Sequence, residues 1–117
     1  MKKPRSSKKF IYLISPNKIK DELIFFLNLR KILKTKKISF FQLRLKKQSL
    51  KKKISIGKEI RKICKKNRVK FIVNDNPLLA KKLMADGCHL GQKDMNILKA
   101  RKILKNKIIG ITCHNSI

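Results

Sequence analysis

Short apolar segments alternate with segments of helical periodicity along almost the whole chain, and this alternation limits the folds open to it. The apolar segments, expected as strands, are 10–15, 38–46, 70–75, 87–91 and 107–114. The segments between them, expected as helices, are 21–34, 55–67, 76–85 and 96–105. Strands that alternate with helices in this way indicate βα units and a parallel sheet. We therefore expect an α/β protein.

The expected helices carry start signals in the sequence. Asp21 precedes the first helix, and Ser55 is the expected N-cap of the second, because Ser side chains accept hydrogen bonds from first-turn amides. Pro77 lies in the first turn of the third, where a missing amide proton costs little. The segment 46–53, with the sequence KKQSLKKK, is expected as a basic loop before the second helix.

The chain is strongly basic, with a formal net charge of +27 at pH 7. Such a charge attracts polyanions, including RNA and DNA. However, 27 lysines stand against 6 arginines, one tyrosine is present, and tryptophan is absent. Arginine forks and aromatic rings are the usual means of nucleic-acid recognition. We therefore expect no specific nucleic-acid partner, and a basic nucleic-acid-binding protein is kept as the alternative from another functional class.

Cysteine spacing and hydropathy bear on the compartment. Cys64, Cys88 and Cys113 are odd in number and far apart, which favours free thiols in a reducing compartment over disulfides or a zinc site. The basic residues 1–9 are followed by no apolar stretch of signal-peptide length, and no run reaches the length of a membrane span. We expect a cytoplasmic protein without a membrane partner, with a basic extension at 1–9 and one domain at 10–117.

The segment 38–46 has apolar side chains on one face and polar side chains on the other. Alternation along a strand puts Phe41, Leu43 and Leu45 on the first face, and Gln42, Arg44 and Lys46 on the second. A strand covered by helices on both faces should be continuously apolar, and burying charged groups costs free energy. Two interpretations explain the polar face. The segment either lines the inner mouth of a barrel or is an edge strand with one solvated face.

The other strands also turn polar at their carboxyl ends. The third strand ends in Asn74 and Asp75, the fourth is followed by Asp94, and the fifth ends in Thr112 and His114. An edge strand explains one such end but not four. Active sites of (β/α) barrels lie at the carboxyl ends of the strands. The combined pattern therefore favours the mouth of a barrel.

The residue types at these ends suit a phosphate-bearing heterocycle. Arg44 and Lys46 can neutralise phosphate oxygens, with Arg44 acting as a bidentate fork. Gln42 and Asn74 offer amide donors and acceptors for the edge of a heterocycle. Pyrophosphate chemistry is the function that these side chains suggest.

The acidic residues have both a functional and a structural interpretation. Asp75 and Asp94 could share a magnesium ion, which prefers carboxylates, water and substrate phosphates. Equally, Asp75 could form a turn before the Asn-Pro pair, and Asp94 could cap the last helix. His89 fits a satisfied core histidine better than a catalyst.

The segments FQLRLK, FIVNDNPLLA, ADGCHLGQKDM and IIGITCHNS closely resemble the thiamine-phosphate synthase family, which includes the related thiazole tautomerases. The resemblance runs from the first strand to the last residue. It implies a (β/α)8 barrel, of which this chain would hold the first four βα units and strand five. Because such barrels need at least about 200 residues, we expect a C-terminally truncated fragment that is inactive alone. Its open edges would favour self-association.

The resemblance also implies a reaction and a set of ligands. The family joins hydroxymethylpyrimidine diphosphate to a thiazole phosphate and releases pyrophosphate, with Mg2+ as cofactor. By resemblance, the residues that bind the pyrimidine diphosphate are Gln42, Arg44, Lys46, Asn74 and Thr112, the last replacing a family serine. The same resemblance places magnesium on Asp75 and Asp94, and it names no catalytic residue. His114 matches a proton-transfer histidine of the tautomerase branch, which is kept as an alternative although the diphosphate and metal residues favour the synthase.

Overall fold

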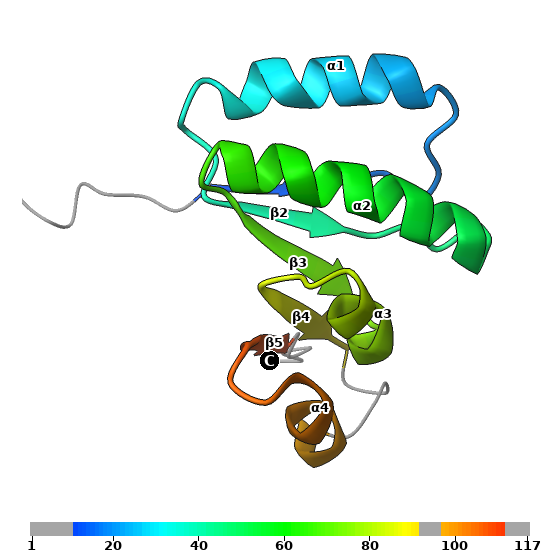
Figure 1. Cartoon of the computed structure of the whole chain (residues 1–117), viewed down its shortest axis with the longest axis vertical. Coiled ribbons are helices and arrows are strands. Elements are labelled where there is room, and N and C mark those ends of the chain that lie inside the picture. The colour runs from blue at the N-terminus through cyan, green and yellow to red at the C-terminus, as the bar shows by residue number, and fades with distance from the viewer. Residues whose placement is uncertain (1–10, 92–96, 112–117) are drawn as a thin grey trace, which may run out of the picture.

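The computed structural model describes residues 11–91 and 97–111, which form five strands and four helices in strict alternation (Figure 1). The strands are β1 (Tyr12–Ile14), β2 (Phe40–Leu43), β3 (Lys70–Asn74), β4 (Gly87–Leu90) and β5 (Ile108–Ile111). The helices are α1 (Glu22–Leu33), α2 (Leu50–Lys66), α3 (Pro77–Lys82) and α4 (Ile97–Leu104). The four βα units and the fifth strand expected from the sequence are confirmed.

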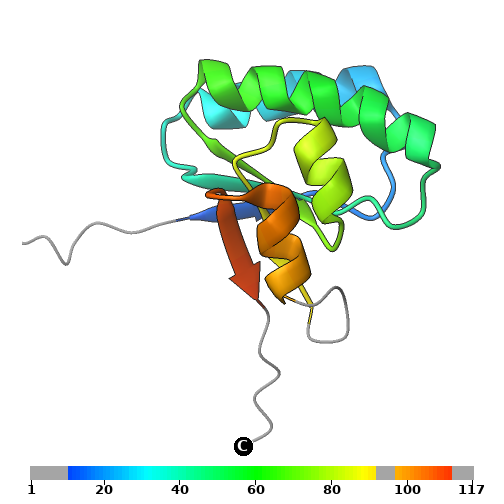
Figure 2. The ribbon, with the colours of Figure 1, turned by 60° about the horizontal axis from the view of Figure 1, so that its bottom comes forward.

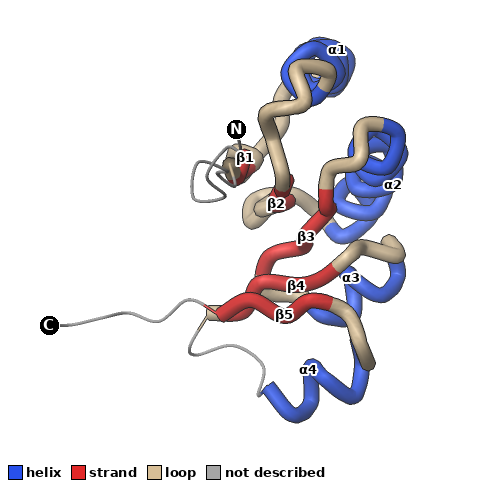
Figure 3. Tube along the Cα trace, turned by 90° about the vertical axis from the view of Figure 1, so that its left-hand side faces the viewer, coloured by secondary structure: helices blue, strands red, loops and turns tan. Residues whose placement is uncertain are grey.

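The five strands form one parallel sheet in the order of the chain, from β1 to β5. The sheet is curved, and all four helices lie on one side of it (Figure 3). Helix α1 lies beside α2, and α3 lies beside α4 (Figure 2). A parallel sheet needs such crossover connections, because the chain must return to the amino-end edge of the sheet before the next parallel strand begins.

The hydrophobic core fills the space between the outer face of the sheet and the helices. Phe41 of β2 and Phe71 of β3 are register partners there, and both are fully buried. Helix α2 buries Ile56, Ile60, Ile63 and Cys64, which confirms the apolar helical face read from their spacing. The Leu83 side chain packs closely on the backbone of α2 at Gly57, where a Cβ atom would lie 2.5 Å from the Leu83 Cδ1 atom.

The start of α2 differs from the prediction. The helix begins at Leu50, and Ser49 is its N-cap, with the Oγ atom accepting a hydrogen bond from the Lys52 amide at 3.2 Å. Ser55, the predicted cap, is an exposed residue inside the helix. The charge of the lysines at 51–53 predicts a solvated loop, but lysine is also a good helix former. Residues 50–53, the second half of the predicted basic loop 46–53, are therefore the first turn of α2.

Strand β2 is shorter than predicted and ends at Leu43. The alternation of side chains nevertheless continues beyond it, because Leu45 is buried whereas Arg44 and Lys46 are exposed. The polar face predicted for this segment is thus confirmed. The predicted end of the fifth strand, at 112–114, lies outside the described residues.

Large apolar side chains are exposed on the inner face of the sheet, opposite the helices. Tyr12 is 58% exposed and Ile14 is 50% exposed. Tyr12 stacks on Phe40 of the next strand, with ring centroids 4.6 Å apart. The Cys64 and Cys88 side chains are buried, and Cys113 lies outside the described residues. No helix in the described part of the chain is long and apolar enough to cross a membrane.

Candidate functional site

Four polar side chains at the carboxyl ends of β2 and β3 are joined in one row. The Gln42 Nε2 atom donates to the Asn74 Oδ1 atom at 2.7 Å, and the Asn74 Nδ2 atom donates to the Asp75 Oδ2 atom at 2.8 Å. The Lys46 ammonium lies 3.2 Å from the same Asp75 oxygen. We call Gln42, Lys46, Asn74 and Asp75 the carboxyl-end cluster. The structure therefore brings together four of the seven residues predicted for the site.

Asp75 is held in an uncommon backbone conformation at the end of β3. Its φ is 59°, in the left-handed region that non-glycine residues seldom adopt. Its amide donates to the His89 carbonyl at 2.7 Å, and its Oδ1 atom accepts from the Gly91 amide at 3.2 Å. These contacts fix the carboxylate against β4. Asp75 is thus the turn former that the sequence suggested, and its side chain lies in the carboxyl-end cluster. Left-handed backbone of this kind is common at functional sites.

Gln42 is only 7% exposed, and its backbone is tied to a residue that the sequence analysis missed. The Ser15 amide donates to the Gln42 carbonyl at 3.0 Å, and the Ser15 Oγ atom accepts from the Arg44 amide at 2.8 Å. Ser15, just after β1, is itself buried. It could have been found from the sequence, because it is the polar end of the first strand, like the ends of the others.

Arg44 lies beside the cluster with its side chain exposed. Within the described residues its guanidinium makes neither a hydrogen bond nor an ion pair, so its donors can turn to a ligand. The Lys46–Asp75 pair is half-exposed on the lysine side, and such pairs contribute only about 0.2–1 kcal/mol. Both cations can therefore move to an incoming phosphate at little cost.

A cavity of about 280 Å³ opens beside the cluster. Its polar wall includes Lys46, Asn74 and Asp75, and Leu43 and Val73 contribute to its apolar floor. Lys53, from the first turn of α2, also lines it. The sequence analysis missed Lys53 because that segment was expected as a loop. A second lysine in the wall raises the positive potential of the cavity.

The described part of the site fits magnesium through one carboxylate. Among the described residues no cluster of three or more His, Cys, Asp or Glu side chains occurs. Mg2+ does not need such a cluster, because it is commonly held by one or two carboxylates together with substrate phosphates. Asp75 offers hard oxygen donors in a cavity that is also lined by Lys46 and Lys53. The predicted partners Asp94 and Thr112, and His114 of the tautomerase alternative, lie outside the described residues.

His89 lies on the inner face of the sheet, in register with Asn74. Its side chain is only partly buried, so it is not part of the core. Gly110 on β5 makes room for it, because a Cβ atom there would lie 3.1 Å from the His89 Cδ2 atom. His89 is therefore less buried than the core residues, and it lies with Asn74 on the inner face of the sheet.

Comparison with known proteins gives consistent matches. The family model described as thiamine monophosphate synthase matches residues 11–117. The chain is 68% identical over 117 residues to a thiamine-phosphate synthase of Pelagibacter ubique, covering 100% of this chain and 56% of that protein. It is 38% identical over 107 residues to a thiamine-phosphate synthase of Flavobacterium psychrophilum, covering 91% of this chain and 50% of that protein. The chain thus spans about half the length of these relatives.

A solved structure supports the fold. The chain superposes on a thiamine phosphate pyrophosphorylase from Pyrococcus furiosus with a TM-score of 0.75 and 30% identity, covering 87% of this chain and 48% of the other. This neighbour has a TIM-barrel-like fold. The curved parallel sheet with helices on its outer side is accordingly the arrangement of a (β/α) barrel.

Proposed function

This chain belongs to the thiamine monophosphate synthase family, and from that premise we propose that its carboxyl-end cluster binds hydroxymethylpyrimidine diphosphate for coupling to a thiazole phosphate. In this reaction the bond between the pyrimidine methylene carbon and the diphosphate oxygen breaks. The thiazole nitrogen forms the new bond to that carbon, and pyrophosphate leaves. The observation that carries the proposal is the joined row of Gln42, Asn74, Asp75 and Lys46.

The amide side chains are suited to the pyrimidine ring. The hydrogen bond from Gln42 to Asn74 fixes the orientation of both amides, because Asn74 can accept it only through its carbonyl oxygen. Asn74 in turn must donate to Asp75, which accepts only. The pyrimidine edge would therefore meet groups of defined polarity, which favours one orientation of the ring and of the methylene carbon attached to it.

The cations are suited to the diphosphate. Arg44 would bind two phosphate oxygens through its planar fork, and Lys46 would leave Asp75 to bind another. Positive charge placed where the leaving group gains negative charge lowers the barrier to bond breaking. We propose the same role for Lys53, which reaches the cavity from α2. Thr112 would add a hydroxyl contact.

Asp75 and Asp94 would hold the magnesium ion. When bound, Mg2+ supplies positive charge to the departing diphosphate. The role of this chain is to present the Asp75 carboxylate in a fixed position, through the Gly91 and Asn74 hydrogen bonds. Lys46 compensates the charge of that carboxylate before the ligand arrives.

The proposal is tested by calorimetric titration of the chain with hydroxymethylpyrimidine diphosphate, with and without Mg2+. Asp75→Asn should weaken binding by tenfold or more and remove the gain from Mg2+, because a bond to a charged group contributes about 1.5–3 kcal/mol. Glu59→Gln is the matched control, since it removes a carboxylate on α2 that pairs with Arg30 away from the site. Equal affinity of the two variants would refute the proposal.

The two alternative functions are less well supported. The relatives named above are synthases, which favours coupling over tautomerisation of a thiazole phosphate. Tautomerisation alone would also leave the diphosphate-binding cations without a purpose. The same comparisons do not favour a nucleic-acid-binding protein.

A further inference from the structure

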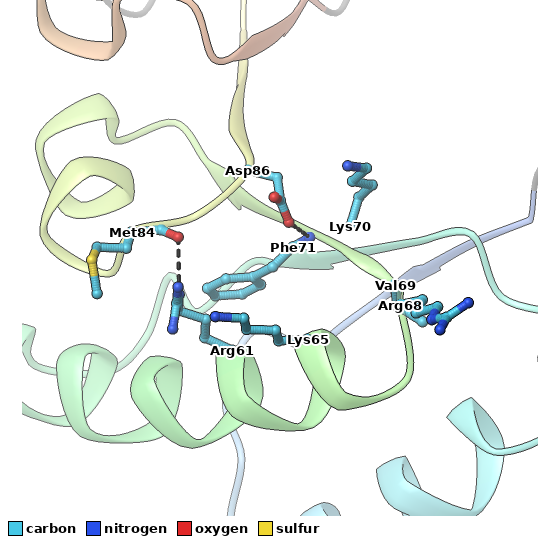
Figure 4. A pocket seen from close by; sticks show the side chains of 8 residues that line it. All are labelled: Arg61, Lys65, Arg68, Val69, Lys70, Phe71, Met84 and Asp86. Atoms are coloured by element: carbon cyan, nitrogen blue, oxygen red, sulfur yellow. Dashed lines mark hydrogen bonds between the residues drawn. The ribbon is translucent and has the colours of Figure 1, made fainter.

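A second cavity, of about 330 Å³, lies at the opposite, amino ends of the strands (Figure 4). We call it the basal cavity. The cavity is lined by Arg61 and Lys65 of α2, by Arg68 in the turn after that helix, by Lys70 at the start of β3, and by Asp86 before β4. It shares no lining residue with the cavity at the carboxyl end. The proposed pyrimidine site therefore does not account for it.

The basal cavity has an excess of positive charge. Four cations and one carboxylate line it, so its formal net charge is +3 (4 − 1). In the described part of the chain, none of these cations lies within 4.0 Å of an acidic oxygen, and the ion pairs found there involve other residues. Cations gathered in a concave site without acidic partners attract anions more strongly than the same charges on a convex surface.

Two of the cations are positioned from the same face of α2. Arg61 and Lys65 are four residues apart and both face Phe71 (Figure 4). The Arg61 Nε atom donates to the Met84 carbonyl at 3.0 Å, which anchors the guanidinium and leaves its two terminal nitrogens for another acceptor. Like charges at this spacing repel each other. An anion between them would relieve that repulsion.

The carboxylate of Asp86 is committed to holding strands together. Its Oδ2 atom accepts from the Phe71 amide at 2.8 Å, and its own amide donates to the Phe71 carbonyl at 2.8 Å. Its carbonyl accepts from the Ile108 amide at 3.0 Å. Asp86 thereby joins β3 to β5. Its position is explained by these bonds, and it does not form an ion pair with Arg61 or Lys65.

We propose that the basal cavity binds a small phosphorylated anion, of the size of a diphosphate. Its volume is at the lower end of the range for small-molecule pockets, roughly 300–1,000 Å³. The aromatic side chain in its wall, Phe71, is only 1% exposed and offers no face on which a nucleobase could stack. A guanidinium and an ammonium side by side suit a compact phosphate group.

The basal cavity and the proposed pyrimidine site lie at opposite ends of the same strand, β3. Phe71 lies at the start of β3 and Asp75 follows its end, about 13 Å away at the rise of a β-strand. One diphosphate cannot reach both places. The proposed anion is therefore a second ligand, and its binding does not depend on the proposed synthase activity.

The test is a titration of the 15N-labelled chain with inorganic pyrophosphate, without Mg2+ and in 150 mM KCl. At that salt concentration the Debye length is about 8 Å, so long-range attraction by the general positive charge is screened. The amides of residues 61–71 and 84–87 should shift. The double variant R61Q/K65Q should bind about tenfold or more weakly, because it loses two charged donors.

The matched control is K62Q/K66Q. Lys62 and Lys66 lie on the same helix with the same spacing, are exposed, and do not line the cavity. This variant should stay within about twofold of the parent chain. Equal losses in the two double variants would overturn the proposal, because they would show attraction by overall charge alone. Absence of the amide shifts would overturn it as well.

Two further arms complete the test. If R61Q/K65Q does not fold, K65Q alone keeps the Arg61–Met84 hydrogen bond and should still weaken pyrophosphate binding several-fold. A 12-nucleotide RNA provides the macromolecular arm. Tighter binding of the RNA than of pyrophosphate, with the same amide shifts and the same sensitivity to R61Q/K65Q, would overturn the assignment to a small anion.

Discussion

The two ends of the sheet carry cavities of similar size, about 280 Å³ and 330 Å³, but they are organised differently. At the carboxyl end, a buried amide, a half-buried amide, a carboxylate and an ammonium form one connected row. At the amino end, the cations lack acidic partners among the described residues, and the one carboxylate of the cavity is bound to the backbone. A connected row of donors and acceptors can recognise the hydrogen-bonding edge of a heterocycle, whereas isolated cations select a ligand only by its charge.

The backbone shows the same contrast. Five non-glycine residues in the described part of the chain have positive φ. Four of them follow helices and lie in the loops that lead to the amino ends of strands, namely Lys36, Arg68, Met84 and Lys105. The fifth, Asp75, is at the carboxyl end of β3. The first four end helices, where glycine is usually found. Only Asp75 joins the strained conformation to a side chain with several polar contacts in the site.

The largest effect is expected at Gly87, at the amino end of β4. A Cβ atom there would lie 2.3 Å from the Ile108 carbonyl oxygen, and a backbone atom cannot move aside as a side chain can. Gly87→Ala should lower the free energy of unfolding by about 3 kcal/mol in urea titrations. At Gly57 the crowding atom is the end of the flexible Leu83 side chain. Gly57→Ala also gains about 1 kcal/mol of helix propensity, so a loss equal to that of Gly87→Ala would contradict this explanation.

Substitutions of Asp86 and Asp75 should affect different properties, with Asp86 contributing mainly to stability and Asp75 mainly to ligand binding. Asp86→Asn removes a charged acceptor from the Phe71 amide and should lower the free energy of unfolding by about 2 kcal/mol. Asp75→Asn should lower it by less than about 1 kcal/mol, because the half-exposed Lys46 pair contributes little and the asparagine oxygen can still accept from the Gly91 amide in place of the carboxylate. Unfolding titrations compare the two directly. A larger loss of stability from Asp75→Asn than from Asp86→Asn would show that the roles are reversed.

Cys64 gives the stability a specific dependence on pH. Burial, and secondly the nearby Asp86 charge, raise the pKa of the Cys64 thiol to about 12 from its ordinary value of 9.0. The folded chain therefore binds this proton more tightly than the unfolded chain does. The resulting stability is fully present below pH 9 and is lost as pH rises toward 12.

At pH 10 this loss should amount to about 1 kcal/mol in the parent chain. Comparison with Cys64→Ala removes the contribution of lysine and tyrosine titration, which the two proteins share. The difference in stability between parent and variant should narrow between pH 9 and pH 10. A constant difference would mean that the thiol ionises normally in the folded chain.

The smallest effect concerns the loops at the amino ends. Lys36→Gly should raise the free energy of unfolding by about 0.5–1 kcal/mol, because glycine adopts a φ of 63° without steric cost. Lys37 has an ordinary φ, so Lys37→Gly only gains flexibility in the unfolded chain and should be slightly destabilising. Thermal unfolding of the two variants measures the difference. Equal changes in the melting temperature of the two variants would show that the backbone of Lys36 is not strained.

Most of the fold could be predicted from the sequence because strand and helix periodicities are both clear in it. The polar face of segment 38–46 placed Gln42 and Lys46 on the same side, and the structure confirms it through the contacts of Asn74 and Asp75. The start of α2 was predicted too late in the chain, because the charge of the lysines was given more weight than their helix propensity. For the same reason, the sequence did not predict that Lys53 lines the cavity.

The basal cavity was beyond sequence reasoning for a different reason. Arg61 of α2, Lys70 of β3 and Asp86 before β4 come from three separate segments, and only the packing of these elements brings them together. Left-handed helix ends at residues such as Met84 also lack the glycine that normally signals them. Cytoplasmic location, self-association through the edges of the sheet, and the roles of Asp94 and Thr112 stay predictions.

The most direct test of the central claim is to map hydroxymethylpyrimidine diphosphate with Mg2+ on the 15N-labelled chain. The amides of residues 42–46 and 74–76 should shift, and those of residues 61–71 should not. The shifts at 42–46 should weaken strongly in Asp75→Asn and persist in R61Q/K65Q. Shifts confined to residues 61–71 and 84–87, or shifts unaffected by Asp75→Asn, would contradict the account.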